Sequence, residues 1–94
     1  MLRSELIERL AYEAKDLSDL DVEIVVRTVL EAMSDQLACH GRIEIRGFGA
    51  FSSKKRNPRN AHNPKTGVKV SVPEKWIPFF IPGKELRERV NRAN

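Results

Sequence analysis

The segment from Ser52 to Lys69 constrains the fold more than any other part of the chain. Its only large apolar side chain is Val68, while six lysines and arginines carry charge. Such a segment has too little apolar surface to form part of a hydrophobic core. The pairs Asn57-Pro58 and Asn63-Pro64 favour turns. We therefore predict a long hairpin arm over about residues 53–73, with its tip near Pro64.

Charge is distributed unevenly along the 94 residues. Residues 1–41 hold four basic and nine acidic side chains, whereas residues 42–94 hold thirteen and four. Such a concentration of positive charge is typical of a protein that binds a polyanion, although a charged surface can also simply be solvated. The basic segment has no amphipathic helical face of the kind that binds anionic membranes. Nucleic acid is therefore the favoured partner, and we expect no membrane association.

Two amphipathic helices precede the basic half. The first is predicted over residues 4–14, with Ser4 available as its N-cap. The second begins after Ser18, which with Asp21 resembles a capping box, and Gly41 is placed just after its C-terminal cap. The apolar stripe of the second helix comprises Val22, Val25, Val26, Val29, Leu30, Met33 and Leu37. The first helix is too short to cover this stripe, so we expect part of it to face a second subunit.

Alternating polar and apolar residues begin at Arg42. In the segment 42–46 the isoleucines are expected to face the core, while Glu44 and Arg46 share the exposed face. GFGAF follows at residues 47–51. Its two phenylalanines are three positions apart, so both reach the core only if a glycine bend shifts the register between them.

The chain returns to the core in an apolar strand from Trp76 to Ile81, whose parity the pattern leaves open. Pro82-Gly83 ends that strand, and residues 84–92 predict a short third helix. Its first amides could bind a phosphate, or the helix could simply cover the core. These elements predict an α+β fold: two N-terminal helices, a three-stranded antiparallel sheet with a long β-hairpin arm, and a short C-terminal helix.

No set of residues indicates catalysis or a cofactor. Cys39 and His40 are adjacent and His62 is the only other histidine, so three or four ligands at zinc spacing are missing. No nucleophile, base and orienting group stand out. We therefore expect no enzymatic activity, no metal, no cofactor and no small-molecule substrate. A single cysteine and the lack of a signal-like apolar run predict a cytoplasmic protein.

Three motifs together resemble a known family. RIEIRGFGAF at residues 42–51, NPKTG at 63–67 and PGKELRERV at 82–90 are similar to the bacterial histone-like DNA-bending family that includes HU and integration host factor. SELIERLA at 4–11 and RIEIRGFG at 42–49 resemble the integration host factor beta chain more than HU. The resemblance covers essentially the whole chain.

This resemblance implies an intertwined dimer whose two β-arms bend double-stranded DNA through the minor groove. The chain would be one DNA-bending domain over 1–94, with a helical dimerisation base at 1–41, the sheet and arm at 42–81 and the C-terminal helix at 82–94. Nucleoid association, with roles in recombination, transcription, translation regulation, replication and nucleoid organisation, is likewise implied by the family.

The resemblance also implies roles for individual residues. Pro64 matches a wedge that enters between base pairs and kinks the duplex, with His62, Asn63, Lys65 and Thr66 around it at the arm tip. Arg46 would enter the minor groove, oriented by Glu44, although the two could also form an ordinary surface ion pair. Phosphate contacts are expected from ten basic residues: Arg3, Arg42, Lys54, Lys55, Arg56, Arg59, Lys69, Lys75, Lys84 and Arg87.

Four hypotheses remain open from the sequence. The first is a beta-type subunit that pairs with a related alpha chain and prefers certain DNA sites. The second is an HU-like homodimer with little sequence preference. The third is an RNA-binding protein, which is less favoured because no aromatic residue lies between Phe51 and Trp76 to stack on bases. The fourth is a purely structural oligomer. His62 also stands where the family usually has arginine, so the arm has one less permanent charge near its tip.

Overall fold

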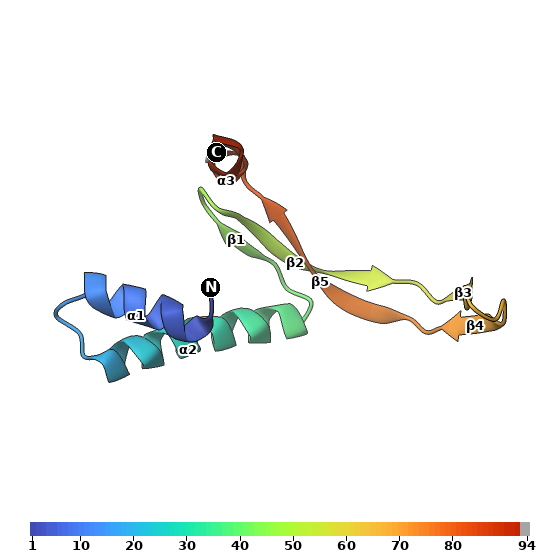
Figure 1. Cartoon of the computed structure of the whole chain (residues 1–94), viewed down its shortest axis with the longest axis horizontal. Helices are drawn as coiled ribbons and strands as arrows, with labels where there is room; N and C mark the ends of the chain where they lie inside the picture. Colours follow the sequence, from blue (N-terminus) through green and yellow to red (C-terminus); the bar gives the residue numbers. More distant parts are fainter. Residues whose placement is uncertain (93–94) are drawn as a thin grey trace. The chain divides into compact units, whose positions relative to one another are not determined.

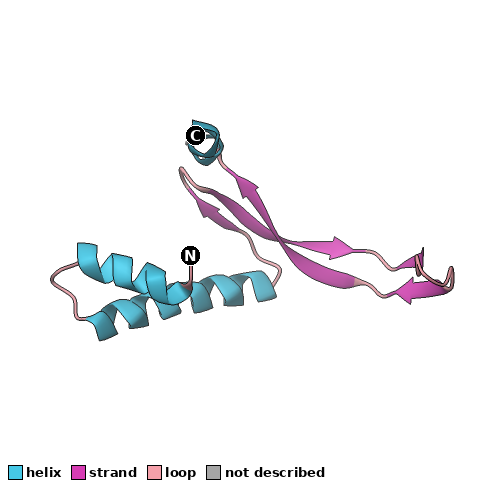
Figure 2. Cartoon of the chain, in the orientation of Figure 1, coloured by secondary structure: helices cyan, strands magenta, loops and turns pink. Residues whose placement is uncertain are grey.

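The computed structural model describes residues 1–92 and has an α+β architecture (Figures 1 and 2). The helices are α1 (Arg3–Glu13), α2 (Asp19–Ala38) and α3 (Lys84–Arg92). The strands are β1 (Ile43–Ile45), β2 (Gly49–Arg56), β3 (Arg59–His62), β4 (Lys69–Val72) and β5 (Lys75–Pro82). The predicted fold class is confirmed, and α3 has the predicted bounds. The contacts divide the chain into two compact units, residues 1–35 and the residues from 36 onward.

Helix α1 begins one residue earlier than the sequence predicts. Leu2 is its N-cap in extended conformation, and the Leu2 backbone N–H donates to Glu5 Oε1 at 3.1 Å. The Glu5 carboxylate therefore supplies the acceptor at this helix end, and Ser4 lies inside the first turn. The prediction that Ser4 caps α1 was wrong.

Helix α2 begins with the predicted capping box. The Asp21 backbone N–H donates to Ser18 Oγ at 3.1 Å, and the Ser18 N–H donates to Asp21 Oδ2 at 3.4 Å. Each side chain thus satisfies an amide that the helix leaves without an intrahelical partner. The shorter aspartate side chain reaches far enough to replace the more usual glutamate.

Replacing Ser18 with alanine is expected to lower the free energy of unfolding by about 1 kcal/mol, because the Asp21 amide loses its acceptor. Ser4→Ala is the matched control. Ser4 lies within a helical turn, where alanine is the better helix former, so this variant should lose no stability. Urea unfolding followed by circular dichroism measures both, and an equal loss in the two variants would contradict the assignment of the caps.

The apolar stripe of α2 is only partly covered within the chain. Val22 and Val26 are buried, at 2% and 5% exposure, whereas Val25 and Val29 remain 52% and 51% exposed. Val22 and Val26 are the only buried residues in the described part of the chain. A chain with so small a core of its own gains stability when a second subunit covers the exposed stripe.

After helix α2, a histidine rather than the predicted glycine takes the left-handed position that follows the C-terminal cap. His40 has a positive φ of 60°, its N–H donates to the Leu37 carbonyl, and the Gly41 N–H donates to the Gln36 carbonyl at 2.9 Å. These two bonds form the Schellman pattern, with His40 in the left-handed position directly after the cap. The prediction for Gly41 was therefore one residue off. Gly41 is required for another reason, because a Cβ there would meet the side chain and carbonyl of Gln36.

The left-handed His40 is held by a contact with the sheet. Its imidazole stacks on the Trp76 ring of β5, with ring centroids 3.7 Å apart and an interplanar angle of 26°. Nearby, Ser53 Oγ of β2 donates to the Leu37 carbonyl at 2.7 Å. Both contacts fix residues 36–40, which comprise the end of α2 and the two residues after it, against the two longest strands. The stack stabilises a backbone conformation that is uncommon for a non-glycine residue.

The three-stranded sheet is antiparallel in the order β1-β2-β5. Phe51 pairs with Ile43 on one side and with Phe80 on the other, and the Phe51 and Phe80 ring centroids are 4.5 Å apart. Residues directly opposite each other share a face. One face is therefore aromatic, and it carries Ile43, Ile45, Phe51, Trp76 and Phe80.

A turn between β1 and β2 shifts the register as predicted. The Phe48 N–H donates to the Ile45 carbonyl at 2.9 Å, and Gly47 has a φ of 81°, which favours glycine. Phe48 consequently contacts Phe80, with ring centroids 5.5 Å apart, but it remains 42% exposed, so the expectation that it reaches the core was wrong. Ile45 is nevertheless 40% exposed, so its prediction as a core residue was wrong. It is paired with Gly49, which has no side chain to cover it.

The arm continues from β2 and β5 into the two-stranded sheet of β3 and β4 (Figure 1). Arg56 is opposite Lys75 and Arg59 is opposite Val72, so both ladders keep one register and Pro58 and Pro73 lie at the same level between them. Proline has no N–H to donate, which interrupts the ladder there. Val68, predicted to resume a strand, lies in the turn before β4.

No helix within residues 1–92 is both long enough and apolar enough to cross a lipid bilayer.

Candidate nucleic-acid interface

One face of the three-stranded sheet carries four of the predicted contact residues: Glu44, Lys54, Arg56 and Lys75. The pairings Glu44 with Ala50, Ala50 with Ile81, Ser52 with Phe79, Lys54 with Ile77 and Arg56 with Lys75 place all these side chains on the same side. We call this side the basic face. At the end nearest the arm it carries three cations, and its centre is apolar. The sequence left the parity of β5 open, and the register now settles it.

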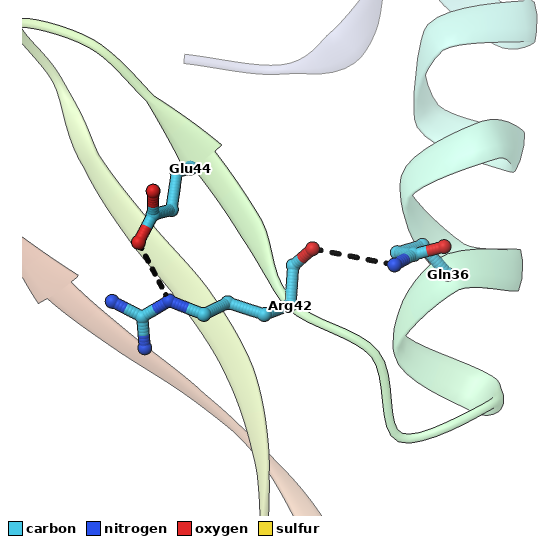
Figure 3. A network of polar contacts seen from close by, with 3 residues as sticks. All are labelled: Gln36, Arg42 and Glu44. Carbon is cyan, nitrogen blue, oxygen red and sulfur yellow. Dashed lines mark hydrogen bonds and ion pairs between the residues drawn. The ribbon is translucent and has the colours of Figure 1, made fainter.

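Glu44 pairs with Arg42 (Figure 3), and no ion pair joins it to Arg46 within residues 1–92. Arg42 Nε donates to Glu44 Oε1 at 2.9 Å, and Gln36 Nε2 donates to the Arg42 carbonyl at 3.3 Å. The expected Glu44–Arg46 pair is therefore corrected. The reason is local: β1 ends at Ile45 and the chain turns at Arg46, whereas Arg42 precedes the strand on the side of Glu44.

Arg46 lines a hollow beside the turn. The hollow has a volume of about 630 Å³ and is also lined by Glu44, Ala50 and Ile81 of the basic face. Arg46 is exposed. Its guanidinium is thus accessible to an anionic ligand at this end of the sheet.

Three predicted phosphate contacts meet at the base of the arm. Arg56, Arg59 and Lys75 line a hollow of about 560 Å³, together with Asn57, Val72, Pro73 and Ile77. No carboxylate lines this hollow. The convergence of three cations around one concave surface suits a phosphate group.

The arm tip is a tight loop that presents Pro64. The Asn63 N–H donates to the Val68 carbonyl at 2.9 Å and the Gly67 N–H donates to the Asn63 carbonyl at 2.7 Å. Asn63 Oδ1 accepts from the Lys65 N–H at 2.9 Å, and Thr66 Oγ1 accepts from the Val68 N–H at 3.3 Å. Asn63 and Thr66 therefore shape the loop from within. The exposed Pro64 ring and the Lys65 side chain are left for a ligand.

His62 and Lys69 form the last pair of the arm before the tip. Both are exposed, and they lie on the same face as Asn60 and Ser71, because β3 and β4 pair Asn60 with Ser71 as well. This face of the tip therefore holds one permanent cation and one histidine. The structure places both beside the loop that presents Pro64.

The remaining predicted contacts are exposed, and two of them form surface ion pairs. Lys55 Nζ lies 3.4 Å from Glu74 Oε1, and Lys84 Nζ lies 3.9 Å from Glu88 Oε1. Such pairs contribute little and exchange readily for another anion. Arg87 lies on α3. Arg3 belongs to α1, in the other compact unit.

The start of α3 offers fewer amides than predicted. The Gly83 N–H donates to the Phe48 carbonyl at 2.8 Å. It is therefore not available to a phosphate. This bond instead joins Gly83, which lies between β5 and α3, to the turn between β1 and β2.

Two contacts of the three-stranded sheet, one on each face, were missed by the sequence analysis. One is the His40–Trp76 stack. The other is the position of Lys54 Nζ, 3.8 Å from the centroid of the Phe79 ring. Both depend on the register between β2 and β5 and on the parity of β5, which the apolar run from Trp76 to Ile81 does not reveal. Within residues 1–92, no group of three His, Cys, Asp or Glu side chains could hold a metal ion.

The chain matches one protein family over nearly its whole length. The model of the family described as bacterial DNA-binding protein covers residues 1–91. Among individual relatives, the chain is 58% identical over 94 residues to the integration host factor subunit beta of Thioalkalivibrio sulfidiphilus, covering 100% of this chain and 98% of that protein. It is 54% identical over 93 residues to the same subunit of Saccharophagus degradans, covering 99% and 95%.

Solved structures share the fold. Anabaena HU in a cocrystal with DNA superposes with a TM-score of 0.86 at 30% identity, covering 98% of this chain and 99% of that one. HU from Thermotoga maritima superposes with a TM-score of 0.65 at 30% identity, covering 96% and 98%.

Proposed function

The chain belongs to the bacterial DNA-binding protein family, and we propose that its residues bend double-stranded DNA by inserting Pro64 from the tip of the arm. It is an architectural DNA-binding protein of the integration host factor and HU type. One observation carries the proposal for the arm: a tight loop presents the exposed Pro64 ring, and the strands behind it carry cations.

The wedge and the cations have complementary roles. Unstacking one base step costs about a few kcal/mol, which the additional contacts of bent DNA offset. The cluster of Arg56, Arg59 and Lys75 would hold phosphates at the base of the arm, and His62 and Lys69 would do so near its tip. These contacts position the protein without reading sequence. Lys54, Lys55, Lys84, Arg87 and Arg3 are proposed as further phosphate contacts.

Arg46 is proposed to enter the minor groove, where its cation is attracted most strongly to narrow, A·T-rich segments. The geometry changes the role of Glu44. Because Glu44 accepts from Arg42 Nε, the carboxylate orients Arg42 in the free chain, and Arg46 remains free to follow the groove. A preference for DNA sequence would then come from groove shape more than from hydrogen bonds to base edges.

The partner is proposed to be a related alpha chain. The relatives named above are beta subunits at more than 50% identity, and the exposed stripe of α2 provides apolar surface for an intertwined dimer. The alternative is a self-paired dimer of the HU type, which the likeness to HU structures supports. Purification from native cells followed by intact mass spectrometry distinguishes a mixed dimer from a self-pair.

We further propose that the chain acts as one DNA-bending domain in the cytoplasm, associated with the nucleoid. Recombination, transcription, translation regulation, replication and nucleoid organisation are the processes that such bending would serve.

The proposed function is tested by combined bending and competition assays. The native dimer is added to a short duplex with a donor and an acceptor dye at its ends, and energy transfer should rise as the ends approach. An excess of random DNA should displace the protein from a preferred duplex less easily than from bulk DNA. No rise in energy transfer would rule out bending. Equal displacement would rule out the sequence preference and leave the HU-like alternative.

A further inference from the structure

We infer that Phe79 is a positioning residue that holds the Lys54 ammonium ready for a phosphate on the basic face. The inference rests on the proposed DNA-binding function. It assigns a role to an aromatic residue that has no polar group of its own. Lys54 Nζ lies 3.8 Å from the centroid of the Phe79 ring, well within the distance of about 6 Å at which a cation is attracted to a ring face.

The sheet register brings the two side chains together. Ser52 is opposite Phe79 and Lys54 is opposite Ile77, so Lys54 and Phe79 are diagonal neighbours on the same face. Diagonal neighbours lie about 7–8 Å apart, within reach of long and aromatic side chains. Phe79 is half-buried and Lys54 is exposed. The ring is therefore fixed in the sheet, while the ammonium above it stays accessible to solvent.

The electrostatic setting of Lys54 differs from that of its neighbour Lys55. Lys55 is on the opposite face and pairs with Glu74. Within residues 1–92, no carboxylate forms an ion pair with Lys54. The ring attracts the ammonium but carries no net charge, so the positive charge of Lys54 is not neutralised. An ammonium has three donors, and those directed away from the ring can reach a phosphate oxygen.

The expected benefit is preorganisation. A free lysine side chain loses rotamer freedom when it binds a phosphate, and this ordering opposes binding. A lysine already held over a ring loses less. Arg56 and Lys75 lie farther along the same face and repel Lys54, so the ring also compensates for crowding of like charges. Phe79 thus contributes to affinity through Lys54, without touching DNA itself.

The test is a double-mutant cycle on the full-length dimer, with DNA affinity measured by fluorescence anisotropy at several salt concentrations. Phe79→Leu keeps an apolar side chain and removes the ring, and it should weaken binding about 2- to 5-fold. Phe79→Tyr keeps the ring and should bind as the unchanged protein does. Lys54→Ala should lower the salt slope by roughly one. In the Lys54→Ala background, Phe79→Leu should have no further effect.

Two controls separate this inference from simpler explanations. In a Lys55→Ala background, Phe79→Leu should keep its full effect, because Lys55 is on the other face. In the free protein, the Lys54 side-chain protons should show a ring-current shift in NMR spectra that Phe79→Leu removes. An equal effect of Phe79→Leu with and without Lys54, or no ring-current shift, would overturn the inference. If neither the unchanged protein nor any variant binds DNA, the proposed function itself has failed.

Discussion

Replacing Pro64 with alanine is expected to reduce the DNA bend sharply while leaving the dimer folded. The loop that presents Pro64 is held by bonds from Asn63, Lys65, Gly67 and Val68, and none of them uses the proline side chain. Alanine therefore keeps the loop but lacks the rigid ring that separates two bases. Each wedge of this kind accounts for a kink of roughly 20–90°. End-to-end energy transfer on a short duplex measures the change.

A second variant tests whether the effect belongs to the proline. Val68 is in the same loop and is 60% exposed, so Val68→Ala removes apolar surface from the tip without removing the ring. This control should bend DNA nearly as the unchanged protein does. An unchanged bend angle in Pro64→Ala, or an equal loss in both variants, would eliminate the assignment of Pro64 as the wedge.

Replacing Gly49 with alanine is expected to have the largest effect on stability. A Cβ at this position would lie 2.6 Å from the Ile81 carbonyl oxygen and 2.6 Å from Cε1 of the Phe80 ring. Both neighbours belong to β5, which pairs with β2 along its whole length, so neither can move without breaking the ladder or the aromatic cluster. The free energy of unfolding should fall by about 3 kcal/mol, the upper part of the range for overpacking.

Gly67→Ala is the contrasting variant. Gly67 has a φ of 71°, but a Cβ there would meet nothing within 4 Å. Its effect comes from the left-handed backbone alone and should be about 1 kcal/mol. Urea unfolding at fixed protein concentration compares the two variants. A loss for Gly49→Ala no larger than that for Gly67→Ala would show that β5 yields to the added methyl group.

The elements that could be predicted are those specified by neighbouring residues. The Ser18–Asp21 capping box, the turn at Asn63-Pro64 and the helix after Gly83 all depend on residues within a few positions of each other. Local patterns therefore located α2, the arm tip and α3. The same patterns failed at the first helix. Serine is the better capping residue by type, but Leu2 and not Ser4 occupies the N-cap position.

The features that could not be predicted depend on contacts between distant segments. His40 adopts the left-handed conformation next to a glycine, and its imidazole stacks on Trp76, 36 positions later in the sequence. Lys54 meets Phe79 only because of the register between β2 and β5. Glu44 is between two arginines at equal spacing, and only the turn after Ile45 decides which one it pairs with. Sequence spacing alone leaves such choices open.

The facing prolines of the arm also bear on solubility. A two-stranded ribbon such as β3 and β4 has an open edge on each side, and open edges invite pairing with strands of other molecules. Pro58 and Pro73 interrupt the pairing at the same level and so keep the β3–β4 ribbon short, and the lysines and arginines beside them repel a second arm of the same charge. The composition that prepares the arm for DNA therefore also keeps arms of separate dimers from joining into a continuous sheet.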